Sequence, residues 1–224
     1  IAIFSILVDT SPKQTSSQNS NIMSEMVEGA SYVLHNKIFL GLTVISFCAS
    51  TFGTSYMILL PIFASDVLQV GAQGFGAMEA AAGTGAIIGT LLVIKFGASK
   101  KIGLTIIWCS ALFGIALSLF ALTKVLILSM TMLLIAGMFQ SIYLNFSMTV
   151  IQLTVPDALR GRVMSIYTTT YFLISIGGFL SGMLAAATSV PFTIMLFALI
   201  VTSFAFLVYF LLPEVKNIDF LNDH

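Results

Sequence analysis

Six long apolar stretches, separated by short polar segments, constrain this chain more than any other feature of its sequence. They cover approximately residues 38–62, 74–94, 102–122, 125–150, 163–187 and 191–212. Each is long enough to cross a hydrocarbon core of about 30 Å as a helix that rises about 1.5 Å per residue. Only 8% of the residues are charged, whereas a water-soluble domain has roughly 25%. We therefore expect an all-α membrane protein with six transmembrane helices, although periodicity also permits one stretch to form a re-entrant pair.

The basic residues predict which side of the membrane each connection occupies. If all six stretches cross, Lys124 is the only basic residue on one side. The other side receives Lys13, Lys37, Lys95, Lys100, Lys101, Arg160, Arg162 and Lys216. Because basic residues concentrate in cytoplasmic connections, both termini are expected in the cytoplasm. Dropping any one span would destroy this alternation.

A short polar loop lies between the fourth and fifth stretches. Pro156 favours an extended residue before it and so ends the preceding helix. Asp157 can cap the next turn, and Gly161 lets the backbone bend. Arg160 and Arg162 predict that the loop stays on the cytoplasmic side, where they could serve as membrane anchors or as part of a gate.

This loop carries the pattern Pro-Asp-x-x-Arg-Gly-Arg-Val-Met-Ser over residues 156–165. It resembles the loop between the tenth and eleventh helices of major facilitator superfamily transporters, and in particular the drug- and siderophore-exporter branch, of enterobactin and macrolide type. Residues 28–36 are similar to the segment before helix seven of that branch. The resemblance covers residues 22–213 and implies the C-terminal six-helix half of a fold in which two halves move about a midplane site.

A second basic loop, residues 95–103, resembles a degenerate copy of the superfamily's Gly-x-x-x-Asp-Arg-x-Gly-Arg motif. Ser99 stands at its acidic position, which argues against a charge-relay gate there. Lys100 and Lys101 can equally be a basic turn that follows the positive-inside rule.

The chain then divides into four predicted parts. Residues 1–9 are the end of a preceding transmembrane helix, and residues 10–37 a cytoplasmic interdomain linker with an amphipathic helix. Residues 38–213 form the six-helix half, and residues 214–224 a cytoplasmic tail. Because the chain opens with Ile1 on a cut-off apolar helix, we expect a fragment. The resemblance implies that the N-terminal six-helix half is the part that is missing.

Glycines mark surfaces where helices can approach closely in lipid. Gly85 and Gly89 are spaced four apart in a stretch made largely of Gly, Ala and Thr, and Gly178 and Gly182 repeat the spacing later. The resemblance places these two helices against the other half, where a sliding contact would need the same smooth surface.

Polar residues inside the stretches are candidates for binding substrate or protons, because each is costly in a membrane unless satisfied. The candidates are Glu79, Gln140, Tyr143, Asn145, Tyr167 and Tyr171. They could line a solvated cavity or join helix to helix. Glu79 shares a helix face with small residues and could hold a proton or a cationic solute, or be a carboxylate wetted from outside.

Several function classes are disfavoured. The formal net charge of zero argues against a nucleic-acid-binding protein, which normally carries an excess of basic residues. The sequence contains no phosphate-binding loop and no hydrolase motif. Cys48 and Cys109 lie in apolar stretches, and His35 and His224 are far apart, so we expect no disulfide, metal or cofactor.

The resemblance implies a secondary transporter, not an enzyme. It implies a multidrug-resistance or siderophore antiporter of the plasma membrane, in bacteria the inner membrane, that exports a hydrophobic or amphipathic small molecule in exchange for protons. The alternatives are a lipid or lysolipid transporter, or a membrane receptor or scaffold that transports nothing.

Overall fold

The computed structural model describes residues 31, 35–97, 101–155, 161, 163–164 and 172–216. Every regular element among them is a helix, which confirms the all-α prediction for this part of the chain. The elements are α2 (Lys37–Cys48), η1 (Ala49–Gly53), α3 (Tyr56–Ile62), η2 (Phe63–Val67), α4 (Gly71–Phe96), α5 (Ile102–Ala121), α6 (Leu126–Thr154), α8 (Leu173–Ala187), α9 (Val190–Leu211) and α10 (Pro213–Lys216), where η marks a π-helix.

Five helical stretches are long and apolar enough to cross a membrane. They are Lys37–Val67, Gly71–Lys95, Ile102–Ala121, Leu126–Thr154 and Val190–Leu211. The remaining predicted span, 163–187, is described only in part, and its helix α8 has 15 residues. The sixth crossing therefore stays a prediction.

The first span is longer than the sequence predicted and does not end near Pro61. Pro61 lies inside α3, and the helix continues to Val67 through the π-helix η2. Proline has no N–H for the regular helical ladder, and the next turn is wider, with Leu68 N donating to Phe63 O at 3.0 Å. Pro191, in contrast, stands in the first turn of α9, as predicted.

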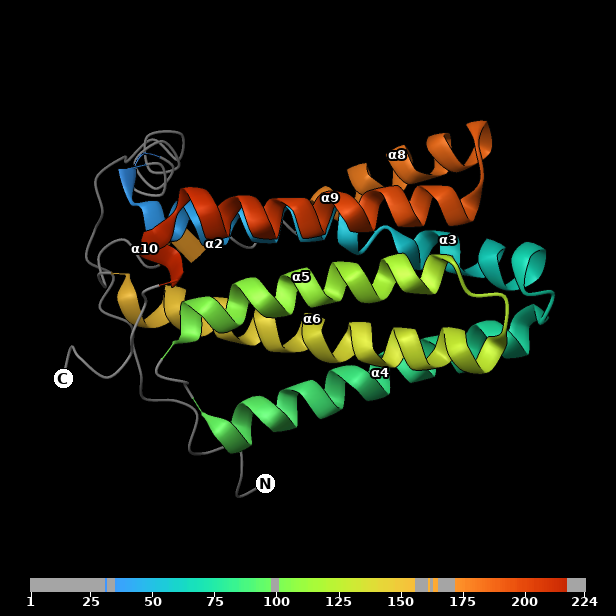
Figure 1. Cartoon of the computed structure of the whole chain (residues 1–224), viewed down its shortest axis with the longest axis horizontal. Helices are drawn as coiled ribbons and strands as arrows, with labels where there is room; N and C mark the ends of the chain where they lie inside the picture. Colours follow the sequence, from blue (N-terminus) through green and yellow to red (C-terminus); the bar gives the residue numbers. More distant parts are fainter. Residues whose placement is uncertain are drawn as a thin grey trace, which may run out of the picture.

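The long helices run roughly along one common axis (Figure 1). α4 packs along α6, and α5 lies between α6 and α9, so most of α5 is buried. Aromatic side chains fill the spaces between these helices. The rings of Phe63 and Phe120 lie 4.6 Å apart, and those of Phe113 and Tyr143 lie 5.9 Å apart.

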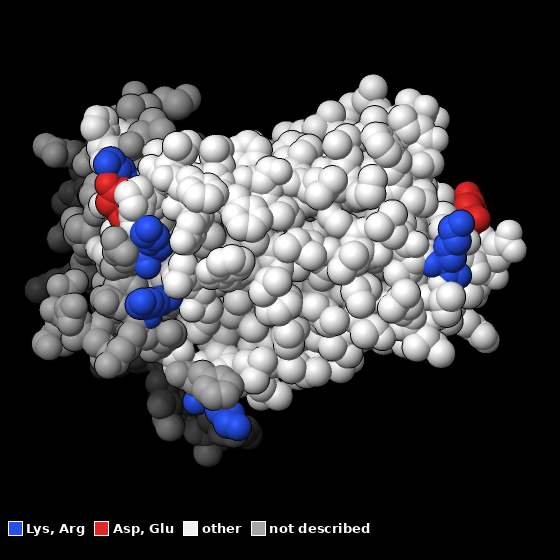
Figure 2. All heavy atoms as spheres, in the orientation of Figure 1, with Lys and Arg blue, Asp and Glu red and all other residues white. Residues whose placement is uncertain are grey.

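Charged side chains gather at the two ends of this bundle. On the face seen in Figure 2, an uncharged belt separates the two ends. Lys37, Lys95, Lys101 and Lys216 lie at helix ends that meet on one side, whereas Lys124 lies in the α5–α6 connection opposite. The described residues therefore keep the predicted asymmetry of basic charge.

At the basic end of the bundle, an ion pair joins α2, near the beginning of the described chain, to α10, near its end. Lys37 Nζ donates to Glu214 Oε1 at 2.5 Å, which joins the start of α2 to α10. This hydrogen bond lowers the pKa of Glu214 below its ordinary value of 4.5. Lys216 of the same short helix lies 5.3 Å from the centre of the Tyr209 ring.

The predicted parts at the two ends of the chain lie mostly outside the described residues. This applies to residues 1–9, to all of the linker 10–37 except residues 31 and 35–37, and to residues 217–224 of the tail. Their assignments stay predictions.

Candidate functional site

A small cavity opens between α3, α4 and α6 and brings two of the predicted polar residues together. Its volume is about 210 Å³. Glu79 of α4 and Gln140 of α6 line it, and Tyr56 of α3 supplies a third polar side chain. These three residues are far apart in the sequence, and the packing of α4 against both neighbours makes them one group.

The cavity exists because α4 carries little side-chain volume at this level. Ala82, Gly83 and Ala86 line it beside Glu79. A Cβ atom added at Gly83 would meet no other atom within 4 Å. Since liquid water takes about 30 Å³ per molecule, the space suits several waters or a small charged group.

Glu79 lies well inside its helix and faces outward from the bundle. α4 begins at Gly71, which places Glu79 eight residues, or about 12 Å, along the helix axis. Its side chain is exposed, and no ion pair to it occurs among the residues with known positions. A carboxylate in this position is stable only against water, protein or a cation, because hydrocarbon would penalise it heavily.

Tyr56 is a site residue that the sequence analysis did not single out. It is only 3% exposed, yet its hydroxyl finds no hydrogen-bond partner within the described part of the chain. A buried hydroxyl without a partner is costly. A water or a ligand in the cavity would remove that cost, and no signal in the sequence distinguishes this tyrosine from one that is satisfied internally.

Together these groups form a hydrogen-bonding set with one negative charge. The carboxylate of Glu79 accepts hydrogen bonds, the amide of Gln140 donates and accepts, and the hydroxyl of Tyr56 donates. Over the described residues, no three His, Cys, Asp or Glu side chains come close enough to hold a metal ion.

Two other candidates lie elsewhere in the structure. Asn145 Nδ2 donates to Ser141 O at 2.8 Å, and Ser141 Oγ lies 2.7 Å from Thr90 Oγ1 of α4. This network links α4 to α6. Tyr143 is 1% exposed and packs in the core against Phe113. Neither Asn145 nor Tyr143 lines the cavity.

The glycines fall into two groups. A Cβ atom at Gly85 would lie 2.0 Å from Leu134 O, and one at Gly89 would lie 2.4 Å from Met138 O, so both sit directly against the α6 backbone. Gly178 faces the flexible end of Ile58, whereas Gly182 has open space beside it. Gly177, directly before the predicted pair Gly178 and Gly182, makes the close approach of α8: its Cβ would lie 1.7 Å from Thr51 O.

Most of the predicted loop and gate residues lie outside the described part of the chain. These are Lys100, Pro156, Asp157, Arg160 and Arg162, together with the candidate binding residues Tyr167 and Tyr171. Gly161 is described as an exposed helical residue, and Lys101 is exposed immediately before α5. The roles predicted for these residues stay predictions.

Comparison with known families gives one finding. Transmembrane secretion effectors, a family of the major facilitator type, match the chain over residues 2–223. No curated protein matches it. The family match supports a role in transport or secretion rather than an enzymatic one. It spans nearly the whole chain and agrees with the all-helical, multi-pass architecture: the chain belongs to the transmembrane secretion effector family of major facilitator proteins.

Proposed function

We propose that the chain is the C-terminal half of a secondary active transporter that exports a hydrophobic or amphipathic small molecule in exchange for protons. A drug or a siderophore is the expected kind of solute. The observation that carries this proposal is the cavity that joins Glu79, Gln140 and Tyr56 inside a membrane-spanning bundle. Secondary transporters hold substrate and coupling-ion sites near the midplane, between helices of this kind.

Glu79 is the proposed proton-binding group. Its carboxylate lies about 12 Å inside α4 and has no basic partner in the part of the chain that the structure covers. A neutral carboxylic acid is tolerated in an apolar surrounding better than a carboxylate. Exposure to alternate sides of the membrane would therefore let Glu79 take up a proton on one side and release it on the other.

A second six-helix half is the proposed partner of the outward face of α4. This face carries Glu79 together with the exposed small residues Gly76, Ala80, Gly83 and Thr84. Lipid-facing surfaces are normally apolar and bulky, whereas small residues favour close contact between helices. Contact with another half would enclose the cavity and keep the carboxylate away from lipid.

The proposed orientation places the basic end of the bundle, and both termini, in the cytoplasm. The lysines of that end support it through the positive-inside rule. In this arrangement Arg160, Arg162, Lys100 and Lys101 lie on the cytoplasmic side, where they anchor the bundle or contribute to a gate. The proposed location is the plasma membrane, in bacteria the inner membrane.

Replacement of Glu79 tests the proposal. In the full transporter reconstituted into vesicles, Glu79→Gln keeps the size and polarity of the side chain but removes its titration. We expect this variant to lose proton-driven export of an amphipathic probe such as ethidium while it inserts into the membrane normally. Glu214→Gln is the matched control, because it makes the same chemical change outside the membrane, and it should export at the parental rate when equal amounts of protein are compared.

If Glu79→Gln exports at the parental rate and with the parental pH dependence, Glu79 does not couple transport to protons.

A further inference from the structure

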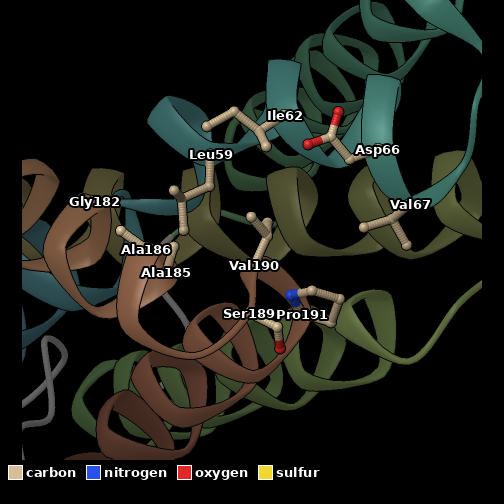
Figure 3. A pocket seen from close by; sticks show the side chains of 10 residues that line it. All are labelled: Leu59, Ile62, Asp66, Val67, Gly182, Ala185, Ala186, Ser189, Val190 and Pro191. Carbon is tan, nitrogen blue, oxygen red and sulfur yellow. The ribbon is translucent and has the colours of Figure 1, made fainter.

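A second, larger cavity lies at the end of the bundle opposite the basic end. Its volume is about 400 Å³. Figure 3 shows α3 and η2 on one side of it, with α8 and the start of α9 on the other. It shares no lining residue with the cavity at Glu79. The inference drawn from it therefore goes beyond the proposed function and does not depend on it.

The walls of this cavity are almost entirely apolar. Leu59 and Ile62 of α3 form one wall, and Val190 and Pro191 at the start of α9 form another. α8 contributes only Gly182, Ala185 and Ala186. A Cβ atom at Gly182 would meet nothing within 4 Å, so the space is left by the small residues of α8 and is not filled from elsewhere in the described structure.

Asp66 supplies a negative charge at the edge of the apolar space. It projects from η2 in Figure 3, and its side chain is exposed. Ser65 Oγ donates to Asp66 Oδ1 at 2.6 Å, which leaves the other carboxylate oxygen available. Lys124 lies at the same end of the bundle, but no described basic residue forms an ion pair with Asp66.

We propose that this cavity binds an amphipathic monocation, with the hydrocarbon part between α3 and α8 and the cationic group at the carboxylate of Asp66. Apolar walls favour the hydrocarbon part through burial. The uncompensated carboxylate favours a cationic head over a neutral or anionic one. A quaternary ammonium compound has both features, and phenyltrimethylammonium is small enough to serve as a probe.

Cysteine protection measures occupancy of this cavity directly. The protein carries Ala186→Cys in a background in which Cys48 and Cys109 are replaced by alanine. Both native thiols are buried, and Ala186 is exposed in the cavity wall. The rate at which methyl methanethiosulfonate modifies the new thiol is measured in nanodiscs with increasing phenyltrimethylammonium. Ala187→Cys is the matched control, because Ala187 is exposed one residue further along α8 but does not line the cavity.

We expect phenyltrimethylammonium to protect the thiol at position 186 and not the one at position 187. Asp66→Asn should raise the concentration for half-protection about tenfold, as removal of one charge at close range predicts. Asp66→Glu, which restores the charge, should recover most of the affinity. Benzenesulfonate, an anion of similar size, should not protect.

Three results would overturn the inference. The first is equal protection at positions 186 and 187, which would indicate non-specific partition into the bilayer. The second is absence of protection at both positions. The third is protection at position 186 that Asp66→Asn leaves unchanged.

Discussion

Tyr56 carries a buried polar group that the described part of the chain does not satisfy. Its hydroxyl is buried, lines the cavity beside Glu79 and has no partner among the described residues. In the proposed transporter, the hydroxyl is held ready for water or solute. The free energy that folding loses by burying this hydroxyl without a partner is therefore linked to its role in binding.

The variant Tyr56→Phe tests this role. Removal of a hydroxyl without a partner should leave thermal stability unchanged or raise it, by about 1 kcal/mol in free energy of unfolding. The apparent affinity for the transported probe should fall, because a hydrogen bond to water or solute is lost. Melting in detergent and concentration-dependent transport give the two values. A clear loss of stability would mean that the hydroxyl has a partner within the protein.

Only part of this site could be predicted from the sequence, because the sequence does not show which polar side chains find partners within the protein. Glu79 and Gln140 could be selected because a carboxylate and an amide are costly in an apolar stretch. Asn145 was selected on the same ground, yet it bonds to Ser141 within its own helix. Sequence gives the cost of a polar group, whereas only the packing of helices shows whether the chain or a cavity satisfies it. Tyr56 was missed because its ring is an ordinary core side chain.

At the scale of elements, α4 and α6 make the most extensive contact between two described helices. Gly85 and Gly89 of α4 lie against the carbonyls of Leu134 and Met138. Gly137 of α6 lies in the same way against α4, with a Cβ position 2.2 Å from Ala82 O. Glycine at these positions lets two helix backbones touch, and no side chain could be added without moving one of them.

Alanine should therefore destabilise the protein at Gly85 but not at Gly76. Gly85→Ala places its methyl group against backbone and should destabilise the protein by about 1–3 kcal/mol. Gly76→Ala, in the same helix, meets nothing within 4 Å and should be neutral or stabilising by up to about 1 kcal/mol, since alanine is the better helix former. Thermal melting of both variants of residues 1–224, in which no second half covers Gly76, makes the comparison under identical conditions. Equal destabilisation would show that α4 and α6 are not packed this closely.

Most helix boundaries were predictable, and the first span shows why one was not. Apolar length determines a membrane helix, so the described helices begin and end within a few residues of the predicted positions. Pro61 was taken as the end of its span because proline usually interrupts a helix. In the structure, wider π turns carry the helix on to Val67. Such turns depend on packing and have no sequence signature as clear as apolar length.

For the molecule as a whole, the distribution of charge predicts a testable topology. Single cysteines replacing Gln69 and Thr188, in a background without Cys48 and Cys109, should react with an impermeant reagent from outside the cell. Cysteines replacing Ser99 and Ala158 should not react. Labelling of intact cells gives the answer, with permeabilised cells as the control for reactivity. Labelling of all four positions, or of only the second pair, would overturn the proposed orientation.

The central claim is that this chain works as one half of a transporter driven by a proton gradient. Its most direct test is flux in vesicles that contain the full transporter, no nucleotide and an imposed pH gradient. A panel of amphipathic probes is used: ethidium, a macrolide and a catecholate siderophore. The account predicts saturable movement of at least one probe that stops when an ionophore collapses the gradient, and no movement with residues 1–224 alone. Movement that continues at the same rate without the gradient, or that requires nucleotide, would contradict it.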